Sequence, residues 1–203
     1  MIFYKVVRGI VSGVCHTLFR IKIEGRENIP TDENFIICSN HISLFDPPMV
    51  GLSMPFPVRF MAKEELFSNK IFGSLLKALG AFPIKRGKSD VGALKAAINI
   101  LKNGENLVIF PEGKRSKDGN LNRGKSGAAL IAIKAGVNIL PIGIDGKYGL
   151  FRKMTVRIGK PVILNEYFGK KLETTELQKL TSEKLMPVIA ELAGVETYES
   201  RNS

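Results

Sequence analysis

The stretch that decides the expected fold is residues 35–46, FIICSNHISLFD. Its first five residues, Phe35 to Ser39, form a short apolar run of the kind found in a buried strand. The polar segment after it contains His41 and Asp46 and is followed by two prolines, which favour a helix start. A buried strand that leads through a short polar loop into a helix is typical of an α/β sheet.

The same alternation continues in both directions from this stretch. Short apolar or alternating segments predict further strands at residues 20–24, 58–62, 81–84, 106–110, 137–144 and 154–158. Helical spacing predicts helices at residues 71–79, 91–101, 126–135 and 175–192. The helix at 91–101 is expected to begin at Ser89 and Asp90, and the last helix to be kinked or divided at Pro187. We therefore expect one α/β domain at residues 20–203, with a mostly parallel or mixed sheet covered by helices.

Residues 1–19 are expected to form an amphipathic helix in front of this domain. Its apolar face would hold Phe3, Val7, Ile10, Val14 and Leu18, and its polar face Lys5, Arg8, Ser12, His16 and Arg20. The charges argue against an uncharged span of about 20 residues, and no signal-peptide cleavage pattern follows. Such a helix lies in the interface of an anionic bilayer or packs on its own domain, and the sequence leaves both possibilities open.

The charge balance favours an anionic partner, because 30 Lys and Arg oppose 19 Asp and Glu for a net charge of +11. The sequence contains no zinc-ligand spacing and no aromatic-basic nucleic-acid motif, so nucleic acid is not expected as a partner. Cys15 and Cys38 have no CxxC spacing and no nearby His, which argues against a metal site and a disulfide framework. Cys38 lies in the apolar strand and is expected to be a core residue rather than a nucleophile.

Three polar clusters follow three predicted strands, at residues 40–46 (NHISLFD), 80–86 (GAFPIKR) and 110–116 (FPEGKRS). In open α/β sheets such strand ends usually carry the functional site. Across a loop, Asp46 can accept a bond from one imidazole nitrogen of His41 and leave the other as a general base. Considered alone, Asp46 is also a good N-cap before the prolines, and His41 could be an ordinary hydrogen-bonded loop histidine.

Together with residues 139–142 (ILPI), these blocks resemble in order and spacing the motifs of the glycerolipid acyltransferase family. The resemblance implies that His41 deprotonates the acceptor hydroxyl and that Asp46 orients His41. It also implies that the glycerol-phosphate end is held by Arg86, Glu112, Gly113 and Arg115. The supporting residues expected around them are Asn40, Ser43, Lys85 and Ser116. Two departures from the family pattern are Lys114, where Thr is frequent, and Gly124, which precedes the Lys-Ser-Gly-Ala run.

The activity implied by the resemblance is transfer of a fatty-acyl group from acyl carrier protein or coenzyme A to the free sn-2 hydroxyl of 1-acylglycerol-3-phosphate. The product would be phosphatidic acid, made for phospholipid biosynthesis without a metal or organic cofactor. The enzyme would work on an anionic membrane, as a peripheral or monotopic protein of the cytoplasmic face. The alternative acceptors are another lysoglycerolipid or a glycerol phosphate.

Two other interpretations come from different classes of protein. Residues 119–126, GNLNRGKS, match a Walker A string. A phosphate-binding loop begins where a strand ends, however, and the predicted strand ends at Phe110, so a P-loop nucleotide binder is disfavoured. A basic, non-catalytic module that binds membrane or nucleic acid is supported only by the charge of +11.

Overall fold

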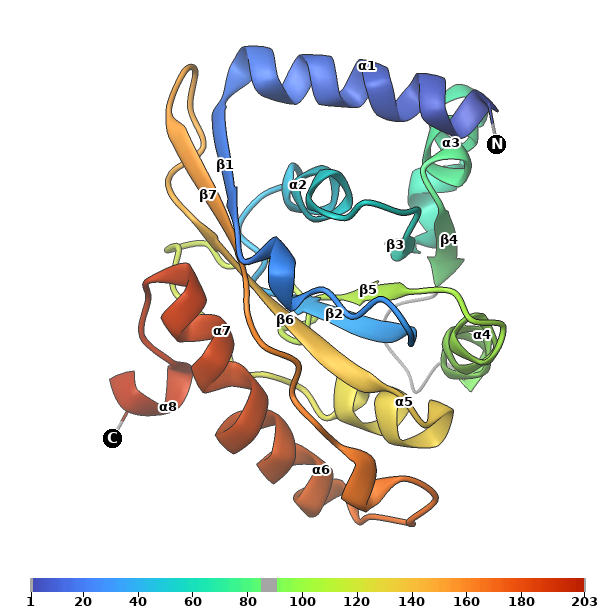
Figure 1. The fold of residues 1–203 in the computed structure, drawn as a ribbon, viewed down its shortest axis with the longest axis vertical. Coiled ribbons are helices and arrows are strands. Elements are labelled where there is room, and N and C mark those ends of the chain that lie inside the picture. The colour runs from blue at the N-terminus through green and yellow to red at the C-terminus, as the bar shows by residue number, and fades with distance from the viewer. Residues whose placement is uncertain (1, 85–90, 203) are drawn as a thin grey trace.

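The computed structural model describes residues 2–84 and 91–202, with side chains from Tyr4 onward. It contains a seven-stranded sheet with the order β1-β7-β6-β2-β5-β3-β4 (Figure 1). The strands are β1 (Arg20–Glu24), β2 (Phe35–Ser39), β3 (Arg59–Lys63), β4 (Ala81–Ile84), β5 (Leu107–Ile109), β6 (Asn138–Asp145) and β7 (Lys153–Ile158). The pair β6–β7 is antiparallel and the other described pairs are parallel, so the expected mixed sheet is confirmed.

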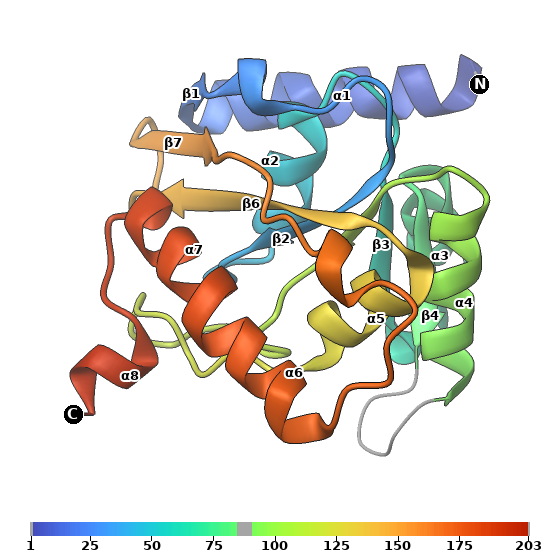
Figure 2. The ribbon, with the colours of Figure 1, turned by 60° about the horizontal axis from the view of Figure 1, so that its bottom comes forward.

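Helices cover both faces of this sheet (Figures 1 and 2). One face carries α1 (Ile2–Leu18), α2 (Asp46–Ser53) and α3 (Lys70–Ala78). The other carries α4 (Val91–Lys102), α5 (Gly127–Ala135), α6 (Thr174–Leu180) and α7 (Met186–Ala193). Short helical turns lie at η1 (Arg26–Asn28), η2 (Glu64–Phe67) and η3 (Asn165–Tyr167), and α8 (Tyr198–Arg201) follows α7. Two apolar clusters, one on each face of the sheet, make the core.

Strand β2 lies in the middle of the sheet and positions the site. All five of its residues are buried, as expected for a parallel strand covered on both faces. Cys38 is in register with Ile109 of β5 on one side and with Pro141 of β6 on the other. The carboxyl ends of these three parallel strands therefore open at the same edge of the sheet.

The predicted elements agree with the structure to within one or two residues at most ends. The expected helix start at Ser89 and Asp90 lies outside the described residues. The closing helix is divided into α6 and α7 by a π-helical turn, η4 (Thr181–Leu185), just before the predicted position at Pro187. Pro187 follows this turn closely and has no N–H to donate to the preceding helical turn, which fits the change in helical pairing at this point.

The prediction of a single apolar face on α1 is wrong, because the helix has two apolar stripes. Val7 faces the domain and is buried, whereas Ile10 and Val14 are 62% and 49% exposed. Arg8, expected among the solvated residues, is half-buried and donates to the carbonyl of Met54 at 2.6 Å. The helix therefore packs on its own domain through one stripe and leaves a second stripe without a partner among the described residues.

Candidate active site

His41 and Asp46 lie in the loop that joins β2 to α2, and the structure brings their side chains together. The Asp46 oxygen Oδ2 lies 2.8 Å from Nδ1 of His41 and accepts from the backbone N–H groups of Ile42 at 2.6 Å and Ser43 at 2.7 Å. Asp46 is fully buried, and His41 is 9% exposed at the surface. The sequence predicted this His–Asp contact.

The surroundings of Asp46 determine which imidazole nitrogen carries the proton. A carboxylate that already accepts two backbone N–H bonds on Oδ2 is an acceptor toward His41 as well, so Nδ1 is the donor. In the neutral ring Nε2 then has its lone pair available to take a proton. The ring of Phe110 stacks on the imidazole with 4.2 Å between the centroids, which fixes the plane of the ring.

The interpretation of Asp46 as a helix N-cap is wrong. Helix α2 begins at Asp46 itself and is preceded by Phe45 in the cap position, with no side-chain cap bond. The Asp46 carboxylate turns back toward the preceding loop because the N–H groups of Ile42 and Ser43 point at it. Its acceptor capacity therefore serves the loop and the imidazole.

Glu112 joins the histidine loop to the loop between β5 and α5. Its Oε1 accepts from the backbone N–H of His41 at 2.7 Å, and its Oε2 accepts from the backbone N–H and the side-chain amide of Asn122 at 2.8 and 2.7 Å. Burial raises the pKa of Glu112, and these three donors oppose the rise. Glu112 thus holds the His41 backbone and the loop at Asn122 together. Its predicted contact with substrate stays a prediction.

Two serines complete this bracing. The backbone N–H of Ser116 donates to the His41 carbonyl at 2.7 Å, and its hydroxyl donates to Asp118 at 2.8 Å. The hydroxyl of Ser43 accepts from the N–H of Phe45 at 3.2 Å inside the histidine loop. Both serines therefore make hydrogen bonds within the loops around His41.

Asn40 locks β2 to β6 directly beside the site. Its side-chain amide donates to the carbonyl of Ile144 at 2.9 Å, and its Oδ1 accepts from the N–H of the same residue at 2.8 Å. The buried side chain continues the sheet pairing for one more residue past the end of β2. The backbone just before His41 is therefore fixed to the sheet.

The remaining predicted residues are cationic or flexible. Lys114 and Arg115 are exposed on the loop that carries Glu112, and Gly113, which precedes them, has the positive φ of 69° that favours glycine. Lys85 and Arg86 lie outside the described residues, so the predicted second pair of cations is not placed. No cluster of three His, Cys, Asp or Glu able to hold a metal occurs within residues 2–84 and 91–202.

Sequence reasoning missed Tyr148, whose hydroxyl donates to Asp46 Oδ1 at 2.7 Å. The residue belongs to no recognised block and lies 102 positions from Asp46 along the chain, so spacing gave no signal for it. Cys38 is fully buried, and burial strongly raises the pKa of its thiol, which fits the expected core residue.

The Walker-like string occupies the loop between β5 and α5. Residues 110–118 separate its first glycine from the end of β5. The carbonyl of Gly124 accepts from the side chain of Gln178 at 2.6 Å, and a Cβ at Gly124 would clash with Met186 and Thr181. Gly124 therefore serves close packing against the C-terminal helices.

Replacing Asn40 by Ala should lower the free energy of unfolding, because it leaves the N–H and the carbonyl of Ile144 buried without their partner. We expect a loss of about 1–3 kcal/mol, measured by urea unfolding. The matched control is Asn165→Ala at an exposed position, with an expected change within about 0.5 kcal/mol. Equal stability of the two variants would show that Asn40 does not lock the strands.

Known proteins share both sequence and fold with this chain. The acyltransferase family model matches residues 20–145. The chain is 34% identical over 206 residues to a 1-acyl-sn-glycerol-3-phosphate acyltransferase of Streptococcus pneumoniae, covering 98% of this chain and 70% of that protein. The enzyme of the same name from Bacillus subtilis is 37% identical over 166 residues, covering 78% of this chain and 82% of that protein.

A solved structure shares the fold as well. The crystal structure of the 1-acyl-sn-glycerophosphate acyltransferase PlsC from Thermotoga maritima superposes with a TM-score of 0.71 at 31% identity. The match covers 93% of this chain and 79% of that one. On the family model, the relatives and the shared fold, this chain belongs to the acyltransferase family.

Proposed function

We propose that this enzyme transfers a fatty-acyl group from a thioester of acyl carrier protein or coenzyme A to the free sn-2 hydroxyl of 1-acylglycerol-3-phosphate. The product is phosphatidic acid, a precursor in phospholipid biosynthesis. The observation that carries the proposal is the buried Asp46 carboxylate on Nδ1 of His41, which leaves Nε2 as the base. The names of the relatives support the choice of acceptor, and another lysoglycerolipid is the alternative.

In the proposed reaction the acceptor hydroxyl lies against Nε2 of His41. The imidazole takes the hydroxyl proton as the oxygen attacks the thioester carbonyl, so a C–O bond forms and the C–S bond then breaks. The proton passes from His41 to the departing thiolate, which leaves as a thiol. General-base catalysis of this kind supplies about a hundredfold to ten-thousandfold, and positioning supplies much of the rest.

The phosphate of the acceptor requires cations near the base. Arg115 is exposed on the same loop as Glu112, which is hydrogen-bonded to the backbone of His41. Arg115 follows Glu112 by three residues, with Gly113 and Lys114 between them, so its guanidinium can reach the catalytic edge. A guanidinium offers two parallel donors to phosphate oxygens, so we assign Arg115 to the phosphate, together with the expected Lys85 and Arg86.

A membrane-embedded acceptor calls for an enzyme that works at the bilayer surface. No described helix is sufficiently long and apolar to cross a membrane. The unpartnered stripe of α1, Val6, Ile10 and Val14, can instead enter the interface from the cytoplasmic face. Lys5 is exposed at the flank of this stripe and attracts anionic head groups.

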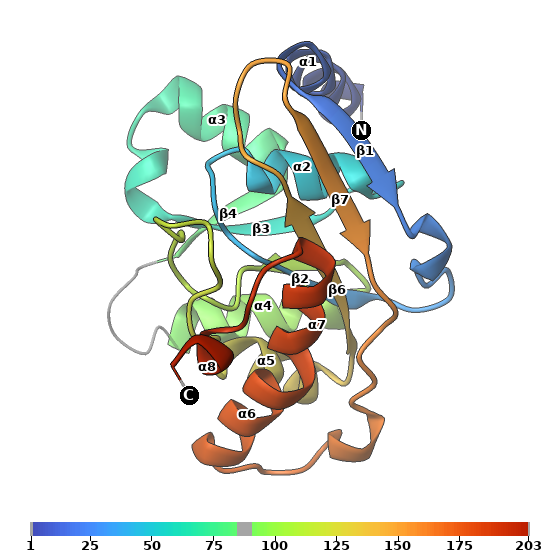
Figure 3. The ribbon, with the colours of Figure 1, turned by 90° about the vertical axis from the view of Figure 1, so that its left-hand side faces the viewer.

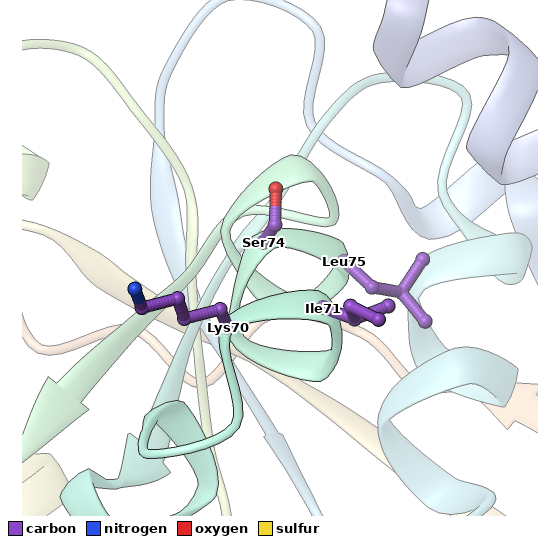
Figure 4. A pocket seen from close by; sticks show the side chains of 4 residues that line it. All are labelled: Lys70, Ile71, Ser74 and Leu75. Carbon is purple, nitrogen blue, oxygen red and sulfur yellow. The ribbon is translucent and has the colours of Figure 1, made fainter.

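Helix α3 extends this surface on the same side of the sheet. Ile71 is 85% exposed, and Phe72 and Leu75 are exposed as well. Figure 4 shows Ile71 and Leu75 extending to one side of α3 and Lys70 to the other. Exposed apolar residues on two neighbouring helices are typical of a face that enters a lipid interface.

Replacing Val6, Ile10 and Val14 together by Ser should weaken binding to anionic vesicles at least about tenfold, since the apolar area that enters the lipid is lost. Activity on detergent-dispersed acceptor should persist, because the buried stripe with Val7 is unchanged. The matched control is Ile163→Ser, an exposed apolar residue elsewhere on the chain. Vesicle binding equal to that of the parent would place the membrane surface elsewhere.

Replacing His41 by Ala should lower kcat for acyl transfer by about a hundredfold to ten-thousandfold while the protein stays folded. Asp46→Asn should lower kcat at least about tenfold, since the amide is a weaker partner for the imidazole. Both are measured with lysophosphatidic acid and each of the two donor types by lipid mass spectrometry. Asp32→Asn at an exposed loop position is the control and should match the parent. A folded His41→Ala variant with full kcat would overturn the mechanism.

A further inference from the structure

The second oxygen of the catalytic carboxylate has a partner of its own. Asp46 uses Oδ2 for the imidazole and two backbone N–H groups, and Oδ1 for the hydroxyl of Tyr148 at 2.7 Å. Tyr148 lies in the loop between β6 and β7, far from Asp46 in sequence. Asp46 is fully buried, so water cannot readily replace this donor.

The ring of Tyr148 packs against two phenylalanines that also contact each other. Phe19 meets it edge-on with 5.3 Å between centroids, and Phe45 stacks on it at 5.9 Å. Phe19 is buried and comes directly after the last residue of α1. Contacts of this geometry stabilise a fixed ring position, so the hydroxyl is held in one place.

The backbone of the same loop is tied to the end of α1. The N–H of Phe151 donates to the carbonyl of Leu18 at 2.7 Å, and the N–H of Arg20 donates to the carbonyl of Arg152 at 2.9 Å. Figure 3 shows the loop between β6 and β7 rising beside the end of α1. Loop, helix end and tyrosine therefore form one rigid unit next to the catalytic pair.

The Tyr148 hydroxyl remains a donor throughout the working pH range. Burial raises the pKa of Tyr148 well above its ordinary value, and the negative charge of Asp46 raises it further. A donor on Oδ1 stops the carboxylate from rotating about its Cβ–Cγ bond. Without it, rotation would take Oδ2 away from Nδ1 of His41 and weaken the hydrogen bond that selects the reactive tautomer.

We propose that Tyr148 is a positioning residue for acyl transfer, whose hydroxyl holds Oδ1 of Asp46 so that Oδ2 stays on Nδ1 of His41. The proposal rests on the function proposed above. Tyr148 acts on His41 through Asp46, so its effect belongs to kcat, and binding of either substrate is left to other residues.

The test is Tyr148→Phe in the full chain, which removes one oxygen atom and keeps the ring contacts. We expect kcat to fall on the order of tenfold and the acceptor KM to stay within about twofold. The acid limb of the kcat/KM profile should move to lower pH. Without the tyrosine donor the Asp46 carboxylate can rotate, so Oδ2 holds the protonated imidazole less strongly.

Other titratable groups near the pair are unchanged by this substitution. Among the described residues they are Glu112, which accepts from the His41 N–H, and Cys15, which acts electrostatically on Tyr148. The matched control is Tyr167→Phe. In the parent protein the Tyr167 hydroxyl accepts from Lys184 at 3.2 Å on the exposed surface. This variant should keep the kcat and the pH profile of the parent.

A second readout needs no substrate and separates the two proposals. Hydrogen exchange of the His41 Nδ1 proton, followed by NMR, should be faster in Tyr148→Phe than in the parent. A parent enzyme without acyl-transfer activity would overturn the proposed function, and the exchange measurement would still decide the role of Tyr148. An unchanged exchange rate, or a fall in kcat without a shift of the acid limb, would overturn the role of Tyr148.

Discussion

The site depends on one buried carboxylate. Asp46 is removed from water, and an ionised carboxylate in that position is tolerated only if its lone pairs are matched by donors. The donors are the Nδ1 of His41, two backbone N–H groups of the loop and the hydroxyl of Tyr148. They come from the loop after β2 and the loop after β6, so the pairing of these central strands is a precondition for the catalytic geometry.

Contacts at the end of α1 link the helix proposed to meet the lipid to the catalytic pair. Helix α1 is the element expected to meet the bilayer, yet one of its stripes is part of the domain core. At its end Phe19 packs on Tyr148, which bonds Asp46. The helix proposed to meet the bilayer and the proposed base are thus joined by neighbouring contacts, an arrangement that would bring the base close to a membrane-embedded acceptor.

The strands could be predicted because each is a short apolar or alternating segment, and the His–Asp contact because both residues follow the central strand. The contact of Tyr148 with Asp46 could not be predicted, because two residues 102 positions apart leave no periodicity or spacing to detect. The faces of α1 were misassigned because a helical pattern shows which residues are apolar but not which stripe meets the domain. The cap assigned to Asp46 failed for a related reason: N–H groups on both sides of a helix start compete for the same oxygen, and only the folded loop decides between them.

The most direct test of this account is the protonation of the His41 ring in the resting enzyme. The chain has two histidines, so His16→Ala leaves a single imidazole to observe by nitrogen-15 NMR. Because Asp46 accepts from Nδ1, the neutral ring should carry its proton on Nδ1 and show an unprotonated Nε2. A neutral His41 with the proton on Nε2 would leave no lone pair facing the acceptor and would contradict the assignment of His41 as the general base.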